Sequence, residues 1–171
     1  MKAIAKISRL FVLLSVLMIC SISHAQTMSD PAIQSIKAYL FYNQDERGNS
    51  AGGTMSENII GNPEFTCWNV IIAEGSAAAP SNNTMVIVEI VSDSASYNSN
   101  GKVRLIARNG DGKIVYNQEQ SFYMIGSGVI YQAPFMLFNT GCEELDLLAE
   151  LIAEDKVVSE KSAVIPFACG E

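Results

Sequence analysis

Beyond residue 34 the chain consists of short runs of β-branched, aromatic and alternating residues, which Gly, Asn, Ser and Asp separate. Sustained helical periodicity is scarce, so these runs predict strands and not helices. The expected strands are residues 35–42, 66–72, 84–92, 102–108, 113–118, 121–125 and 129–138. The pattern therefore predicts an all-β fold.

Two of these segments have a strong local pattern. Residues 102–108 alternate strictly, with Val103, Leu105 and Ala107 expected inward and basic side chains outward. Residues 109–112 (NGDG) follow, and Gly and Asn tolerate the positive φ of a tight hairpin, so the next strand should fold back here. Residues 84–92 (TMVIVEIVS) are so continuously apolar that this strand should be central and buried on most of both sides.

Residues 143–154 (EELDLLAELIAE) fit two structures. Thr140 with Glu143 matches a helix capping box, and leucines recur at helical spacing. The same residues also alternate between apolar and acidic, and a matching run at 157–167 follows a polar corner at 154–156. The alternation favours a strand hairpin, in which Leu147 should lie opposite Ile165 and Leu145 opposite Phe167.

The N-terminus has the layout of a secretory signal peptide. Lys2, Lys6 and Arg9 precede a short apolar run at 10–19, and small residues surround a cleavage point after Ala25. We expect residues 1–25 to be cleaved, residues 26–34 to form an N-terminal tail and residues 35–171 to form one domain. The protein should then be periplasmic or secreted, without membrane insertion after cleavage.

Signal cleavage would also remove the single histidine, His24, and with it every histidine-based triad, dyad or metal site. The leader holds three of the 11 basic residues and none of the 18 acidic ones, so eight bases and 18 acids remain, a net charge of −10. An acidic surface repels phosphate backbones, so no nucleic-acid partner is expected. The sequence leaves the oligomeric state open.

Seven to eight short strands in one exported domain imply an antiparallel two-sheet β-sandwich. The layout resembles that of immunoglobulin-like and fibronectin-like sandwiches, and Trp68 on an inward strand face resembles their core tryptophan. The cysteines are not placed like theirs. The resemblance is therefore one of architecture only.

Three cysteines remain after cleavage, so one cannot pair within the chain. Cys142 and Cys169 are nearly symmetric about the corner at residues 155–156, so a hairpin there would bring them almost opposite each other. A bulge near Gly141 would align the sulfurs. We expect Cys142–Cys169 to be a structural disulfide and Cys67 to be a buried free thiol.

These observations favour a non-catalytic protein-binding or accessory module of the bacterial envelope. Catalytic residues, metals and cofactors are not expected, and the chain is not expected to be an enzyme. A long uncovered edge strand would support strand addition to a partner.

Two alternatives remain open. The first is a carbohydrate- or calcium-binding module that uses the long connections at 43–65 and 73–83, with aromatic side chains for stacking on sugars: Tyr39, Phe41, Tyr97 and Tyr131. The second is a carboxylate-dependent hydrolase, which needs paired carboxylates converging on a cleft. Its candidate carboxylates are Glu143, Glu144, Asp146, Glu150, Glu154 and Asp155.

Overall fold

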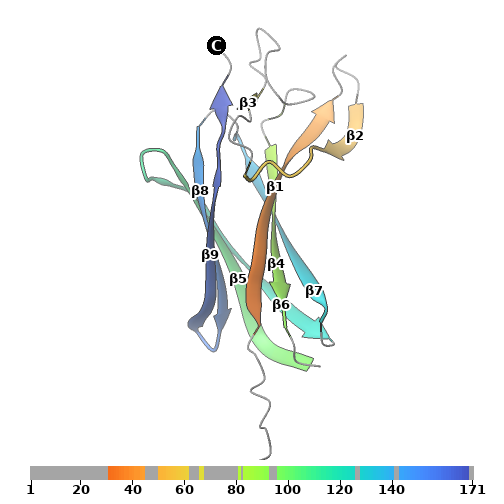
Figure 1. Ribbon diagram of the computed structural model, residues 1–171, viewed down its shortest axis with the longest axis vertical. Helices are drawn as coiled ribbons and strands as arrows, with labels where there is room; N and C mark the ends of the chain where they lie inside the picture. Colours follow the sequence, from red (N-terminus) through yellow and green to blue (C-terminus); the bar gives the residue numbers. More distant parts are fainter. Residues whose placement is uncertain are drawn as a thin grey trace, which may run out of the picture.

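A computed structural model describes residues 31–44, 50–61, 66–67, 81, 83–92, 96–125, 128–140 and 143–169. Strands dominate these residues, and no helix is found among them (Figure 1). The strands are β1 Ala32–Gln44, β2 Ser50–Met55, β3 Thr66–Cys67, β4 Asn83–Val91, β5 Ser96–Asn109, β6 Ile114–Ile125, β7 Ile130–Phe138, β8 Leu145–Ala153, β9 Lys156–Ile165 and β10 Ala168–Cys169.

Eight of these strands form two antiparallel four-stranded sheets. Sheet 1 has the order β2-β1-β4-β7, and sheet 2 has the order β6-β5-β8-β9. Figure 1 shows the sheets as two layers with their strands along the long axis of the molecule. The facing side chains form one hydrophobic core, so the predicted two-sheet β-sandwich is confirmed.

Alternation along each strand explains the core. The inward residues of β5 are Val103, Leu105 and Ala107, as predicted, and all three are fully buried. In β4, which lies centrally in sheet 1 as predicted, Thr84, Val86, Val88 and Ile90 point inward. The prediction that β4 is buried on both sides is wrong for most of its outward residues, which are only partly buried, because sheet 1 has its core on one side.

One lateral side of the sandwich is closed by β1 and β9. The Ile33 backbone N–H donates to Ser159 Oγ at 3.1 Å, and Lys161 Nζ donates to the Gln34 carbonyl at 2.9 Å. Farther along β1, the Leu40 N–H donates to Ser56 Oγ at 2.9 Å. These contacts cover much of the edge of β1, where backbone groups would otherwise be open to a pairing partner.

The hairpin predictions are confirmed, with corrections to bounds and register. Residues 145–153 are strand β8, and the chain reverses at Glu154 and Asp155. The predicted register was wrong: Leu145 lies opposite Ile165 and Leu147 opposite Ala163. A two-residue turn and a bulge between Leu151 and Ile152 set this register, and the sequence pattern indicated neither of them.

Two further corrections concern strand bounds. The predicted strands at 113–118 and 121–125 are one strand, β6, because its ladder with β5 continues through the polar residues between them. The connection predicted at 43–65 contains β2, which pairs with the end of β1. Of the strand predicted at 66–72, only β3 lies in the described residues, and Trp68 lies outside them.

The C-terminal strand, β10, does not continue the β8–β9 hairpin. After β9 ends at Ile165, β10 pairs in parallel with β3. Ala168 is the register partner of Thr66, and Cys169 is the register partner of Cys67. The last described residues are therefore joined to a segment that precedes β4 in the chain.

Candidate functional site

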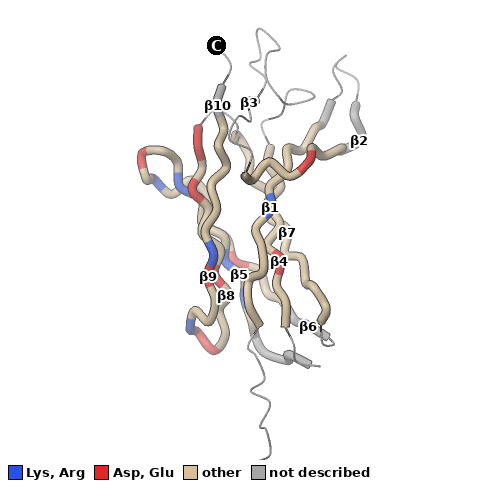
Figure 2. Tube along the Cα trace, viewed as in Figure 1, with Lys and Arg blue, Asp and Glu red and all other residues tan. Residues whose placement is uncertain are grey.

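The two sheets differ sharply in charge. The four strands of sheet 1 contain one lysine and one glutamate, Lys37 and Glu89. The four strands of sheet 2 contain nine charged residues. Figure 2 shows this contrast, with red and blue segments concentrated along β5, β8, β9 and their hairpins. The outer side of sheet 1, with this one lysine and one glutamate, is unusual among the described surfaces, since outer sheet faces are normally polar.

Strand register determines which residues share this outer side. Met85 lies between Tyr39 and Met136, and Ile87 lies between Lys37 and Pro134. Phe41 pairs with Met55 at the β2 edge. We call these outward apolar residues the sheet 1 surface: Tyr39, Phe41, Met55, Met85, Ile87, Val91, Ile130, Pro134, Met136 and Phe138.

Solvent reaches much of the sheet 1 surface. Phe138 is 67% exposed, and Met55 and Ile130 are each 49% exposed. The tyrosine, phenylalanine and methionine side chains belong to the types enriched at protein interfaces, whereas lysine and glutamate are depleted there. Large contiguous apolar patches on soluble proteins are often sites of contact with other molecules.

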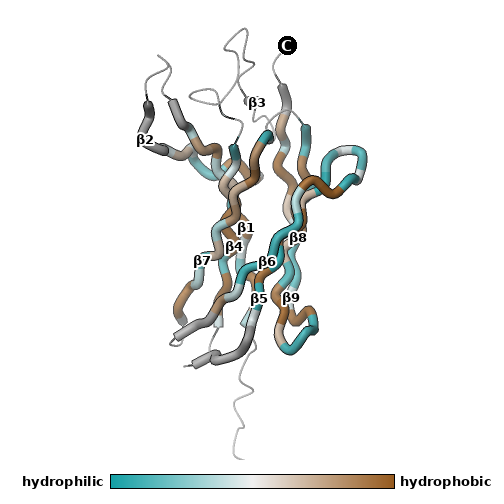
Figure 3. Tube along the Cα trace, turned by 180° about the vertical axis from the view of Figure 1, so that it is seen from behind, coloured by the Kyte–Doolittle hydropathy of each residue, from teal (hydrophilic) through white to brown (hydrophobic). Residues whose placement is uncertain are grey.

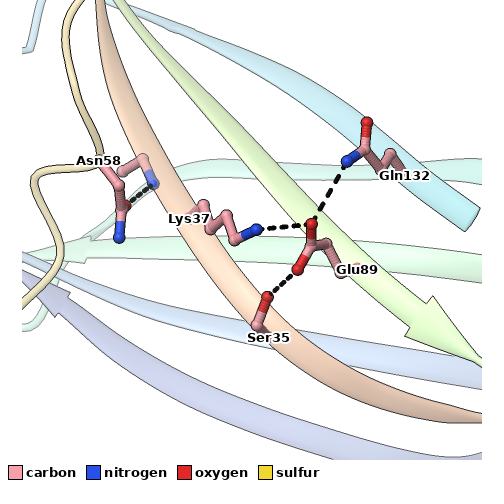
Figure 4. A network of polar contacts seen from close by, with 6 residues as sticks. Ser35, Lys37, Asn58, Glu89 and Gln132 are labelled. Carbon is pink, nitrogen blue, oxygen red and sulfur yellow. Dashed lines mark hydrogen bonds and ion pairs between the residues drawn. The ribbon is translucent and has the colours of Figure 1, made fainter. Parts of the chain in front are cut away.

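A polar cluster lies within the sheet 1 surface (Figure 4). Glu89 is only 7% exposed, and its carboxylate accepts a hydrogen bond from Lys37 Nζ at 2.7 Å. Ser35 Oγ donates to the other carboxylate oxygen, and Gln132 Nε2 donates at 3.3 Å. The hydrogen bond from Lys37, with that from Ser35, holds the pKa of Glu89 below its ordinary value, while the same contact raises the pKa of Lys37. The buried charge is therefore satisfied within sheet 1.

The outer side of sheet 2 is a conventional solvated face. Arg104 forms an ion pair with Glu150 on β8 and a longer one with Glu119 on β6, at 3.5 Å. Lys102 also lies 3.5 Å from Glu119. Cross-strand pairs of opposite charge are common on solvent-exposed sheet faces, and they contribute modestly to stability.

The lateral side between β6 and β7 is the more open one. There Gln120 Nε2 donates to the Pro134 carbonyl at 3.2 Å, and the Tyr116 and Phe135 rings meet edge to face with centroids 6.4 Å apart. A hollow of about 400 Å³ lies here and is lined by both strands, including Val115, Phe138 and the polar middle of β6. Figure 3 shows that polar stretch of β6 in teal. The hollow borders the sheet 1 surface at Phe138.

Pro134 limits what the edge of β7 can bind. Proline has no N–H and cannot donate to the β4–β7 ladder. Pro134 lies opposite Ile87 in that regular ladder, so its backbone groups point away from β4. Its carbonyl is occupied by Gln120. At Pro134 the edge of β7 therefore offers a strand partner neither a backbone donor nor an unoccupied carbonyl, so the edge available for strand addition is interrupted there.

The structure distributes the predicted site residues widely. Tyr39 and Phe41 lie on the sheet 1 surface, Tyr131 packs against Phe122 with centroids 5.7 Å apart, and the Tyr97 side chain lies outside the description. Among the six acids, Glu150 pairs with Arg104, and the described residues contain no cluster of three or more His, Cys, Asp or Glu suited to a metal ion. The backbones of Cys67 and Cys169 belong to β3 and β10, whereas Cys142 lies outside the described residues.

Comparisons with known proteins add little. No protein-family model matches the chain, and no curated protein matches it either. A Bifidobacterium dentium β-glucuronidase in complex with coumarin-3-O-glucuronide shares 11% identity at a TM-score of 0.42, over 80% of this chain and 18% of the other. A putative β-galactosidase from Bacteroides fragilis shares 12% identity at a TM-score of 0.38, over 77% and 30% of the two chains.

This chain thus spans less than a third of each of those proteins. The likeness is too weak to carry an argument about activity. No described helix has the length and apolar character needed to span a membrane.

The sequence reasoning missed the sheet 1 surface, although the signal was present. The run at 84–92 is apolar at both odd and even positions apart from Glu89, and the outward positions of residues 129–138 are apolar apart from Gln132. That pattern was interpreted as burial by the protein's own fold. It equally fits a strand whose outer side contacts another protein.

Proposed function

We propose that this protein is a non-catalytic β-sandwich module that binds another protein through the sheet 1 surface. The observation that carries the proposal is the charge asymmetry between the two outer sheet faces. Sheet 1 has a single lysine and a single glutamate, which neutralise each other, while large apolar side chains remain exposed around them.

The chemistry of the surface defines the partner. The sheet 1 surface is apolar and has no net charge. It therefore fits a partner face that is itself apolar, with water excluded from the contact. The Lys37–Glu89 cluster adds no uncompensated charge to such a contact, so no unpaired charge would be buried there. An anionic polymer or membrane surface would need a basic patch instead.

Location and processing belong to the same proposal. Cleavage after Ala25 would release a soluble acidic chain into the periplasm or the medium, where an envelope protein is the accessible partner. N-terminal sequencing of the exported protein should find Gln26 first. A lipid-modified Cys20 at the N-terminus would contradict the soluble location.

Affinity capture with matched variants tests the function. The tagged mature chain is incubated with an envelope extract in native form, as Phe138→Asp and as Ile130→Asp, and the control is Val157→Asp on β9. Val157 is 46% exposed, close to the 49% of Ile130, but lies on sheet 2. An added carboxylate in a water-free contact is costly, whereas on a solvated strand it is tolerated.

The proposal predicts a retained protein whose yield falls at least tenfold with both sheet 1 variants and stays unchanged with Val157→Asp. Equal retention by all four chains would contradict it, as would the absence of any specifically retained protein. Turnover of a glycan panel by the native chain would contradict the non-catalytic assignment and favour the hydrolase.

The alternative of a sugar-binding module draws on one observation. The hollow between β6 and β7 combines aromatic rings with glutamine amides, the side-chain types that stack on and hydrogen-bond to sugars. A glycan array separates the two functions. Binding of a sugar by the native chain that is lost in Gln118→Ala would favour this alternative.

A further inference from the structure

The register of the parallel β3–β10 pair places two cysteines side by side in the backbone. Cys169 is the register partner of Cys67, although the two residues are far apart in the chain. Neighbouring strands lie about 4.8 Å apart, which falls within the Cα separation that disulfides span, about 4.4–6.8 Å. The placement of these two backbones therefore meets the first requirement of a disulfide.

From this placement we infer that Cys67 and Cys169 form a disulfide that ties the C-terminal strand to the segment preceding β4. Cys142 is then the remaining thiol. This pairing differs from Cys142–Cys169, which was inferred from a β8–β9 hairpin continued to residue 169. In the structure β9 ends at Ile165, and Cys169 belongs to a different sheet from β8.

The size of the β3–β10 pair supports a covalent link. Each strand has only two residues, and so short a parallel ladder is too small to be stable by itself. A disulfide here closes a loop of about 100 residues, the class of loop in which a cross-link most strongly restricts the unfolded chain. The link would hold together two segments that otherwise share few backbone contacts.

The chemistry balances by thiol–disulfide exchange. Two S–H bonds break and one S–S bond forms, and the two electrons and two protons pass to an external disulfide, either oxidised glutathione or a thiol oxidoreductase. That oxidant is reduced to two thiols. Attack begins from the thiolate of one cysteine and passes through a mixed disulfide with the oxidant.

Peptide mapping of the exported full-length mature chain, alkylated without reduction, tests the inference. The expected result is one cross-linked pair of peptides that contains Cys67 and Cys169, with Cys142 alkylated. A cross-link of Cys142 to either other cysteine would overturn the inference. Three alkylated cysteines in protein equilibrated with oxidised glutathione would overturn it as well.

Single variants give a second readout that does not depend on mapping. In denaturant without reductant, Cys67→Ser and Cys169→Ser should each show two reactive thiols, whereas Cys142→Ser should show none. Dithiothreitol should lower the thermal midpoint of native protein and of Cys142→Ser, and leave Cys67→Ser and Cys169→Ser unchanged. An unchanged midpoint in Cys142→Ser, or a reductant-sensitive Cys67→Ser, would contradict the assignment.

Discussion

Lys37 Nζ lies 2.7 Å from Glu89 Oε1, and these two residues are the charged side chains in the described strands of sheet 1. They come from adjacent strands, and Ser35 and Gln132 complete the hydrogen bonding of the carboxylate. Glu89 is nearly buried, whereas the Lys37 side chain is 38% exposed. The pair thus leaves the sheet 1 surface neutral without leaving a buried charge unsatisfied.

Replacing Glu89 tests the energetic role of the cluster. Glu89→Gln keeps an acceptor but removes the charge that Lys37 and Ser35 stabilise, so the free energy of unfolding should fall by about 1–3 kcal/mol. Denaturant titration at pH 7 measures the loss. Glu160→Gln, an exposed glutamate on β9, is the control and should change stability by less than about 0.5 kcal/mol. Equal effects of the two variants would contradict the structural role of the cluster.

The same cluster predicts an acid dependence. The pKa of Glu89 is lowered from 4.5 in the fold, so its stabilising contribution is present above the unfolded value and is lost as pH falls through the folded one. The difference in unfolding free energy between native protein and Glu89→Gln should therefore shrink below about pH 4.5. A difference that stays constant down to pH 2 would show that ionisation of Glu89 does not contribute.

The close contact between Gly101 and Phe122 predicts that a side chain at position 101 would clash. They are cross-strand partners on β5 and β6, and a Cβ at Gly101 would lie 2.4 Å from Phe122 Cε1. Phe122 is buried, so its ring has little room to move, and Gly101→Ala should destabilise the protein by about 1–3 kcal/mol. Gly110→Ala is the control, since nothing lies within 4 Å of its added Cβ. Similar unfolding midpoints for the two variants would contradict the packing described.

The turn between β8 and β9 offers a stabilising change. Glu154 and Asp155 both have positive φ, 50° and 59°, which is the geometry of a turn that favours Asn-Gly. Asp155→Gly should raise the free energy of unfolding by about 1 kcal/mol, because glycine adopts this conformation without strain. Asp111→Gly, at a turn position outside the left-handed region, should instead lower stability or leave it unchanged. A loss of stability in both variants would contradict the turn geometry.

Partner binding should vary little between pH 5 and 8. The mature chain predicted here has no histidine, so no side chain with an ordinary pKa changes charge in that range. Titration of binding to the captured partner measures this. A bell-shaped profile in a hydrolysis assay would instead indicate a carboxylate with a raised pKa and a catalytic role.

Local sequence patterns predicted the hairpins well. Alternation at 102–108 and the Asn109–Gly112 turn specify β5 and β6, because both depend on neighbours in the chain. The strand over 145–153 followed from its alternation despite its helical alternative. The register of that hairpin depends on a bulge beside Ile152, and a single extra residue shifts every later pair.

Long-range pairing could not be predicted in the same way. The β3–β10 contact joins Thr66 to Ala168, and no pattern in two-residue strands specifies such a partner. The sheet 1 surface was hidden for a related reason. The apolar outward residues of β4 and β7 become a surface only when the order of the strands leaves that side without a covering layer.

Hydroxyl-radical footprinting of the sheet 1 surface tests the central claim most directly. The tagged mature chain is oxidised alone and in an envelope extract, and oxidation is measured at three outward methionines of sheet 1, Met55, Met85 and Met136. Exposed valines of β9, Val157 and Val164, report on the other sheet. The account predicts oxidation rates at the methionines that fall several-fold in the extract, with valine rates unchanged. Protection of the β9 valines with unchanged methionines would contradict it.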